Sequence, residues 1–175
     1  TAGVCLPTAG AEEFGDMYFF NLFDNHADSL SGNYYDPEVA AEIAKIADKR
    51  TVRMVDHYTA LTPVNDGFEV GMTYANYNIN VYTKNPQRYI QELAEYQAAA
   101  NQNGFEDVTL GAFEINSGDY TGQIMVVIQA PTAVRLGEFF DAGEEAWNVA
   151  ASAKFPKLRK LKRGFLMTCE IVYAR

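Results

Sequence analysis

From residue 76 to residue 174 the hydrophobic residues change their spacing in one fixed order: strand, helix, strand, strand, helix, strand. Alternation of apolar and polar residues is typical of strands, and apolar residues three or four apart are typical of helices. This βαββαβ order is that of a split βαβ unit, an antiparallel sheet with both helices on one face. Because the opposite face must also be covered, the pattern predicts an α+β barrel, closed within the chain or by dimerisation.

Capping signals delimit the two helices of this segment. Asn85 followed by Pro86 is typical of a helix start, with the asparagine as N-cap and the proline at the first helical position. Gly104 suits the left-handed position that ends the helix, and Thr132 suits the cap of the second helix. The strands are predicted at residues 68–83, 108–116, 123–130 and 165–173, with a basic connector at 154–163.

Residues 1–70 are predicted to form an N-terminal extension, and residues 71–175 the βαββαβ domain. Small, polar and glycine-rich residues at 1–15 indicate an arm, and the aromatic run at 17–23 indicates a buried strand. Two interpretations of the extension stay open: a degenerate copy of the same unit, or an unrelated addition. Its other predicted elements are a polar loop from Asp24 to Tyr35, a helix that starts at Asp36 and Pro37, and a strand at 51–61.

The net charge of −9 at pH 7 argues against nucleic acid and anionic membrane surfaces as partners. No apolar run approaches the roughly 20 residues that a membrane-spanning helix needs, so we expect no membrane insertion. Basic residues nevertheless concentrate at 154–163. This stretch has two interpretations, a docking patch for an acidic partner such as a second copy of the chain, or a solvated connector.

Cys5 and Cys169 lie near opposite ends of the sequence. Chain ends often lie close together in compact domains, so a disulfide between them is one interpretation, and two separate buried thiols are the other. No cysteine or histidine spacing suggests zinc. The candidate disulfide, the acidic composition and a sequence that begins at Thr1 together favour an exported protein, periplasmic or extracellular.

Three asparagines and a tyrosine occupy alternate positions of one predicted strand and therefore share a face: Asn76, Asn78, Asn80 and Tyr82. Asparagine is depleted in strands, because its side chain competes for backbone hydrogen bonds. If this face lines a closed barrel, each amide needs a partner from another side chain, water or a ligand. The pattern therefore makes these four residues candidate ligand-binding residues, with an exposed polar strand as the alternative.

Asp24, His26 and Asp28 would project to the same side of an extended loop. Two carboxylates and an imidazole are suitable ligands for a divalent metal, so the three residues are weak candidates for such a site. A surface loop rich in turn-forming residues is the favoured interpretation, and we expect no metal.

His57 and Glu114 are the candidate catalytic residues. In a strand, Asp56 and Tyr58 share one face and His57 lies on the other. Glu114 also lies in a predicted strand, and a carboxylate inside a barrel of low dielectric would have a raised pKa that suits a general base. An interface histidine and a solvent-facing glutamate are the alternatives.

Residues 76–174 resemble the dimeric α+β-barrel superfamily of ferredoxin-like proteins. The resemblance rests on the order and lengths of the elements, and on the strand at 122–132 that leads into a helix with Leu136, Phe139 and Phe140. It implies a ferredoxin-like antiparallel sheet packed back to back on a second sheet, from another subunit or from residues 1–70. Ligands of such proteins sit between the sheet and its helices or within the barrel.

The superfamily includes cofactor-free monooxygenases of antibiotic biosynthesis and haem-degrading enzymes. Haem-using members need an axial histidine, whereas His26 and His57 both lie outside the matched segment. The resemblance therefore implies no cofactor here.

Two functions follow from these patterns. The first is a small-molecule-binding α+β barrel, which the resemblance extends to a cofactor-free monooxygenase-like enzyme acting on an organic substrate. The second is a non-catalytic secreted assembly protein that packs through its sheet faces. A homo-oligomer is expected in both cases. An enclosed pocket that contains Asn78, Asn80 and a nearby carboxylate or histidine would favour the first, and a filled interior without a cavity would favour the second.

Overall fold

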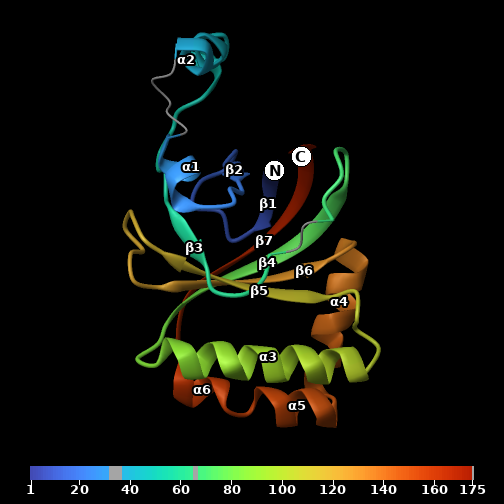
Figure 1. Cartoon of the computed structure of the whole chain (residues 1–175). Coiled ribbons are helices and arrows are strands. Elements are labelled where there is room, and N and C mark those ends of the chain that lie inside the picture. The colour runs from blue at the N-terminus through green and yellow to red at the C-terminus, as the bar shows by residue number, and fades with distance from the viewer. Residues whose placement is uncertain (32–36, 65–66, 175) are drawn as a thin grey trace.

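The computed structural model describes residues 1–31, 37–64 and 67–174. Within these residues the chain is an α+β protein, as predicted, with one antiparallel sheet of seven strands that curls into a half-barrel (Figure 1). Strands from residues 1–70 and strands from residues 71–175 belong to this same sheet.

The strands are β1 (Ala2–Ala9), β2 (Tyr18–Asn21), β3 (Tyr58–Ala60), β4 (Thr73–Tyr82), β5 (Thr109–Ile115), β6 (Ile124–Ala130) and β7 (Lys160–Tyr173). Their order across the sheet is β2-β1-β7-β4-β6-β5-β3, and each neighbouring pair is antiparallel. Residues 1–70 thus add two strands to one edge of the sheet and one strand to the other.

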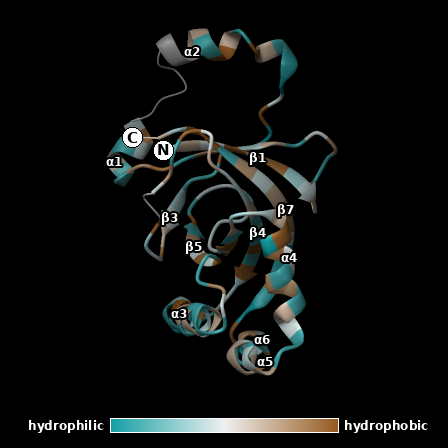
Figure 2. Cartoon of the chain, turned by 90° about the vertical axis from the view of Figure 1, so that its right-hand side faces the viewer, coloured by the Kyte–Doolittle hydropathy of each residue, from teal (hydrophilic) through white to brown (hydrophobic). Residues whose placement is uncertain are grey.

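The helices are α1 (His26–Ser31), α2 (Pro37–Ala44), α3 (Pro86–Gln102), α4 (Ala133–Asp141), α5 (Ala146–Ser152) and α6 (Phe155–Leu158), with short 3-10 turns η1 (Ala47–Lys49) and η2 (Ala142–Glu144). Figure 2 shows the strands as an arc whose convex side faces α3, α5 and α6. None of the described helices is long and apolar enough to cross a bilayer.

The helix-side core forms because α3 and the following helices present an apolar stripe to the convex face of the sheet. Tyr89, Leu93 and Tyr96 of α3 are buried there, and Tyr96 makes edge-to-face contacts with the rings of Phe139 and Phe155. Burial of each such side chain contributes about 1.5–3 kcal/mol to the free energy of unfolding. This core fixes the central strands and so fixes the direction in which their other face points.

The predicted helix caps are confirmed. The side chain of Asn85 accepts a hydrogen bond from the backbone N–H of Arg88 at the start of α3, and that of Thr132 accepts one from Arg135 at the start of α4. Gly104 follows α3 with a φ of +85°, a conformation that glycine adopts without a steric cost. Capping therefore sets the ends of the helices, as the sequence predicts.

The concave side of the sheet has its own smaller core. Cys5, Tyr74, Phe165, Met167 and Ile171 are buried in it. Partly buried side chains that complete this core are Tyr18, Phe20, Phe68, Met72, Met125 and Ala174. The N-terminal segment therefore covers the face of β4 that the helices leave free.

Residues 1–15 contradict their prediction as an arm, because most of them form β1. This strand pairs with β7 from Ala2 opposite Tyr173 to Ala9 opposite Leu166. Only Gly3 and Cys5 within it are buried, so the segment has little hydrophobic signal. Backbone pairing with a long neighbouring strand, which no local pattern encodes, decides its structure.

The aromatic run at 17–23 was predicted as a buried strand, and the burial is wrong. β2 is a four-residue edge strand that pairs with β1. Its outward-facing side chains are open to solvent, and Phe19 is 61% exposed. An edge strand buries at most one face here, because no helix covers the other.

Three other predicted elements differ in extent. The strand at 51–61 shortens to β3, and the single helix expected after Thr132 breaks into α4, η2 and α5. The polar loop contains α1, and the basic connector at 154–163 holds α6 and the first residues of β7. Asp36, the predicted cap, lies outside the described residues, and α2 stands apart from the sheet in Figure 1.

Candidate functional site

The candidate site is the row of three asparagines on the concave face of β4. Asn76, Asn78 and Asn80 are 7%, 5% and 4% exposed, so the predicted polar face is an interior one. β4 is the strand between β7 and β6, and its even-numbered side chains point away from the helices. The N-terminal half of the chain closes over them, because its strands extend the sheet into an arc (Figure 2).

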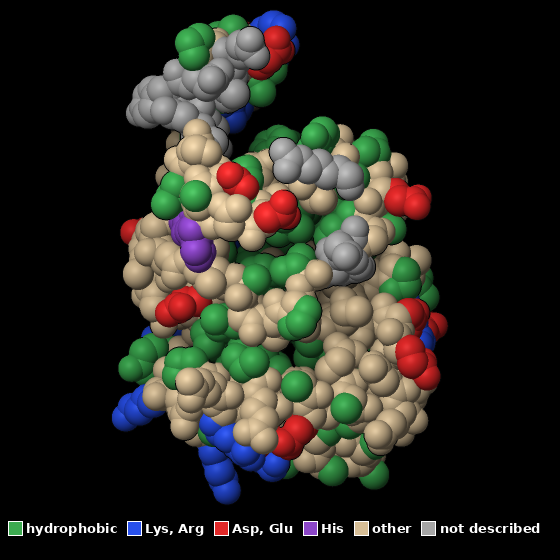
Figure 3. Space-filling view, in the orientation of Figure 1, with side chains coloured by type: hydrophobic (Ala, Val, Ile, Leu, Met, Phe, Trp, Pro, Cys, Tyr) green, Lys and Arg blue, Asp and Glu red, His purple; other side chains and the backbone are tan. Residues whose placement is uncertain are grey.

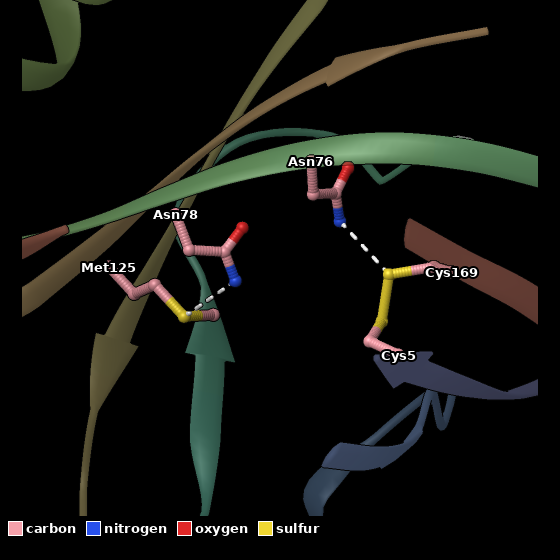
Figure 4. The surroundings of a disulfide bond; sticks show 5 residues. All are labelled: Cys5, Asn76, Asn78, Met125 and Cys169. Atoms are coloured by element: carbon pink, nitrogen blue, oxygen red, sulfur yellow. Dashed lines mark hydrogen bonds between the residues drawn. A yellow bond between two sulfur atoms is a disulfide. The ribbon is translucent and has the colours of Figure 1, made fainter. Parts of the chain in front are cut away.

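Two of the carboxamide nitrogens in this row, those of Asn76 and Asn78, donate to sulfur atoms. Asn76 Nδ2 donates to Cys169 Sγ at 3.7 Å, and Asn78 Nδ2 donates to Met125 Sδ at 3.5 Å (Figure 4). Sulfur is a poor hydrogen-bond acceptor. These contacts are nevertheless directional, because rotating either amide by 180° would place its oxygen against the sulfur lone pairs.

The carboxamide oxygens of Asn76, Asn78 and Asn80 are buried and have no hydrogen-bond partner among the described residues. A buried acceptor without a donor costs about 1–3 kcal/mol. Three such acceptors on alternate residues of one strand are therefore an expensive arrangement for the folded chain. Most buried polar groups in proteins are satisfied by the protein, by ordered water or by a ligand, so each of these oxygens needs a donor.

The side chains that flank the row are apolar and adaptable. Strand pairing places Asn76 beside Met167, Asn78 beside Phe165, and Asn80 beside Met125. Directly opposite residues in an antiparallel pair point to the same face, so these side chains line the same concave surface. Methionine fills irregular spaces well and changes conformation at little cost.

Arg163 closes the Asn80 end of the row, because it lies opposite Asn80 on β7. Its guanidinium pairs with the carboxylate of Glu12, donates to Tyr18 Oη at 3.0 Å and to the Gly10 carbonyl at 3.3 Å. It also lies 4.8 Å from the centre of the Phe165 ring. Arg163 thus attaches the segment that leads from β1 to β2 to the wall of the concave surface.

Another unpaired oxygen lies in the segment before β3. Asp56 Oδ1 is buried and has no hydrogen-bond partner among the described residues, and burial together with the nearby Asp119 carboxylate raises the pKa of Asp56. Burial and the Asp56 carboxylate raise the pKa of Tyr58 to about 12. A Cβ atom on Gly118 would lie 1.9 Å from Asp56 Oδ1, so only glycine permits this approach.

The row is enclosed, and two hollows in the described part of the chain lie outside it. An open depression of about 190 Å³ is lined by Tyr77, Ile79 and residues 161–164. A hollow of about 90 Å³ lies between the sheet and the helices, beside Tyr96 and Phe155. In Figure 3 hydrophobic side chains gather across the middle of the face that Figure 1 presents. A ligand reaches the asparagines only if the covering side chains move.

Tyr82 shares the strand but lies apart from the enclosed row. It is at the end of β4 and 47% exposed, and the pairing of β4 with β7 shifts register between Asn80 and Val81. The predicted set of four therefore divides into three enclosed amides and one exposed ring.

The candidate catalytic residues do not meet the asparagine row. Glu114 is exposed and pairs across the sheet with Ile124, whose side chain belongs to the helix-side core. The backbone N–H of His57 donates to Ser117 Oγ at 2.7 Å, and its Nδ1 lies 3.4 Å from Asn116 Nδ2. The two side chains are therefore not brought together with the amides as an acid–base site.

No three His, Cys, Asp or Glu side chains of the described residues gather as a metal site would require. Asp28 instead accepts a hydrogen bond from Asn25 Nδ2 at 2.8 Å, and the ring of His26 lies 5.2 Å from that of His57. Asp24 is exposed in the turn before α1. Of the three residues weighed as metal ligands, Asp24 thus precedes α1, and His26 and Asp28 lie in its exposed first turn.

Cys5 and Cys169 are joined by a disulfide in the structure, directly opposite each other on β1 and β7. Its Cys169 sulfur is the one that accepts from Asn76 (Figure 4). The bond therefore forms part of the wall beside the asparagine row.

Sequence reasoning missed Met125 and Arg163 as neighbours of the row. Met125 has a signal, since it alternates with Ile124 and Val126 on a strand and so faces away from the helix-side core. Arg163 has none, because only the pairing of β7 with β4 brings it beside Asn80. No protein-family model and no curated protein matches this chain.

Proposed function

We propose that the concave surface of the sheet binds a neutral organic molecule that carries hydrogen-bond donors. The observation that carries this proposal is the row of unpaired carboxamide oxygens on Asn76, Asn78 and Asn80. A ligand N–H or O–H would satisfy each oxygen, and a site built to hydrogen-bond a donor rejects analogues that lack it. The flanking Met125, Met167 and Phe165 suit an apolar body between those donors.

The charge pattern supports a neutral ligand. Among the residues that lie opposite the asparagines on the neighbouring strands, Arg163 is the one with a positive charge, and it is already paired with Glu12. A charged ligand buried beside the asparagines would lose its hydration without gaining a counter-ion, which costs several kcal/mol. Carboxamide dipoles satisfy neutral donors without that cost.

The proposal is tested by protein-detected NMR on the asparagine side-chain amides, with a set of uncharged compounds of fewer than about 15 heavy atoms. We expect compounds with N–H or O–H donors to shift the amide signals of Asn76, Asn78 and Asn80, and donor-free analogues to leave them unchanged. The Asn78→Leu variant should lose the response. Asn101→Leu, the same substitution at an exposed site on α3, should keep it. Equal responses to donors and donor-free analogues would contradict the proposal.

We also propose that β4–α3–β5–β6–α4–β7 forms a ferredoxin-like unit of the α+β-barrel type. The order of its strands, β7-β4-β6-β5, supports this, because the two crossover helices then connect strands that are separated by one neighbour. Comparison of an experimental structure with ferredoxin-like proteins tests it.

A second candidate function, assembly into homo-oligomers, has separate support. Large hydrophobic side chains are exposed across the N-terminal segment: Leu6, Phe14, Met17, Phe19, Phe23 and Leu30. Exposed apolar surface of this kind is typical of protein interaction sites. Sedimentation analysis of the chain and of Phe19→Asp tests it, and we expect the variant to sediment as a smaller species.

The Cys5–Cys169 bond supports export, since disulfides persist in oxidising compartments.

A further inference from the structure

The spacing of the asparagine row carries information about the shape of its ligand. The three side chains stand on residues i, i+2 and i+4 of β4, which rises about 3.4 Å per residue. Successive amides are therefore about 6.8 Å apart along a nearly straight line. A ligand that satisfies all three must carry donors with this repeat.

An extended peptide has the same repeat. Its backbone N–H and C=O groups point to one edge at every second residue, again about 6.8 Å apart. A carboxamide offers one acceptor and two donors, so it can accept from a backbone N–H and donate to the C=O of the same edge. In this row the oxygens are unpaired, and the nitrogens of Asn76 and Asn78 are held only by sulfur.

The surroundings also suit a peptide backbone. Arg163, which lies opposite Asn80, is already paired with Glu12, so the described residues offer a charged ligand no free counter-ion beside the row. A peptide backbone is neutral and needs none. Side chains on either side of it would meet Met125, Phe165 and Met167. Because methionine adapts its shape to its neighbours, this lining suits small apolar side chains of varied form.

The attachment of the covering segments is consistent with ligand entry. β1 is bonded to β7 through Cys5 and Cys169, so that wall is fixed covalently. The side chains over the concave core, Tyr18 of β2 among them, are held by noncovalent contacts such as the hydrogen bond from Arg163. β2 can therefore shift while the disulfide preserves the sheet.

We propose, on the basis of the function proposed above, that the ligand is an extended peptide segment of five or more uncharged residues, bound along β4 through Asn76, Asn78 and Asn80. Each asparagine forms hydrogen bonds to one backbone amide of the peptide, and Asn76 and Asn78 give up their sulfur contacts to do so. Alternate backbone amides of the peptide face the row, and the intervening ones face away.

The test is titration of the intact, oxidised chain with a capped alanine pentapeptide, followed on the asparagine side-chain amides by NMR. Asn78→Leu should weaken binding by about tenfold or more, the loss expected for one or two hydrogen bonds. Asn101→Leu on α3 should leave the affinity unchanged. A pentapeptide N-methylated at every backbone amide should bind about tenfold more weakly or worse. A pentapeptide that is N-methylated only at alternate amides keeps free N–H groups along one edge, and it should bind nearly as well as the unmethylated pentapeptide.

Equal affinity for the parent and the fully methylated peptide would overturn this inference, and that comparison does not depend on any protein variant folding. If single-amide compounds such as N-methylacetamide shift the asparagine signals and the pentapeptide does not, the small-molecule function stands and the peptide inference falls. If neither class shifts them, both fall, and buried water is then the partner of the row.

Discussion

Cys5 and Cys169 lie directly opposite each other on β1 and β7, with their Cα atoms 4.0 Å apart, and a disulfide joins them. The bond connects positions separated by 164 residues, so it restricts the unfolded chain strongly. We expect a Cys5→Ala/Cys169→Ala variant to lose about 2–5 kcal/mol of unfolding free energy in urea. Reductant should destabilise the native chain by a similar amount and leave the variant unaffected. Thiol alkylation without reductant, detected by mass, would expose a wrong assignment by labelling both cysteines.

Asn78→Leu is expected to raise stability while it removes binding. Leucine has the same branched arrangement of side-chain heavy atoms as asparagine and leaves no unpaired oxygen, so unfolding free energy should rise by about 1 kcal/mol. Thermal unfolding of this variant against Asn101→Leu, where the change should stay within about 0.5 kcal/mol, provides the measurement. A large loss of stability would mean that the amide of Asn78 is satisfied in the free protein.

Tyr74 should make the protein less stable at high pH. Burial raises the pKa of Tyr74 to about 12, whereas an unfolded tyrosine ionises near 10. The folded state therefore keeps its proton where the unfolded state loses it, and stability falls as pH rises from about 10 to 12, by about 3 kcal/mol in total. Tyr74→Phe should flatten this part of the pH profile in urea denaturation. An unchanged profile would assign the pH dependence to other groups.

Removing the partners of Glu92 should cost more than removing Glu92 itself. The Glu92 carboxylate is 2% exposed and pairs with Arg88 and Lys154. An Arg88→Met/Lys154→Met variant leaves a buried charge without a cation, and its melting temperature should fall by about 5 °C or more. Adding Glu92→Leu to that variant should restore most of the loss. Additive, independent losses from the three substitutions would show that the charges do not act as a group.

Arg163 should control the mobility of the segment between β1 and β2. Arg163→Met removes the pairing with Glu12 and the hydrogen bonds to Tyr18 and Gly10, which we expect to weaken local protection by about 1–2 kcal/mol. Amide hydrogen exchange over residues 10–18 reports this change, and exchange in α3 serves as the internal control. Arg163→Lys should restore little, since lysine lacks the planar fork that reaches several acceptors at once. Unaltered hydrogen exchange in residues 10–18 would mean that contacts other than those of Arg163 hold this segment in place.

The elements with strong local signals were predictable. α3 has a cap at Asn85, a buried stripe that includes Leu93, and a glycine at 104, and all three are local in sequence. The alternation of β4 likewise predicts that Asn76, Asn78 and Asn80 share a face. Local patterns suffice in these cases because the physics that fixes the element acts between near neighbours.

The rest depends on contacts between distant residues. β1 is a strand because β7 offers it a partner, and Arg163 lies at the asparagine row because β7 and β4 pair in one particular register. Whether the row faces the interior or the solvent was left open by the sequence, since that depends on the curl of a sheet built from both ends of the chain. His57 and Glu114 illustrate the same limit, because alternation assigns a face and leaves the distance to the amides undetermined.

The pairing of Ala2 with Tyr173 has a consequence for rearranging the chain. A short linker would join the two ends, and new ends placed in the turn at residues 117–121 would leave the order of strands in space unchanged. In such a circular permutant the two cysteines would be separated by 11 positions plus the length of the linker, in place of 164. The same disulfide would then contribute about 2 kcal/mol less to the free energy of unfolding. The permutant therefore separates the effect of loop length from the effect of the bond itself.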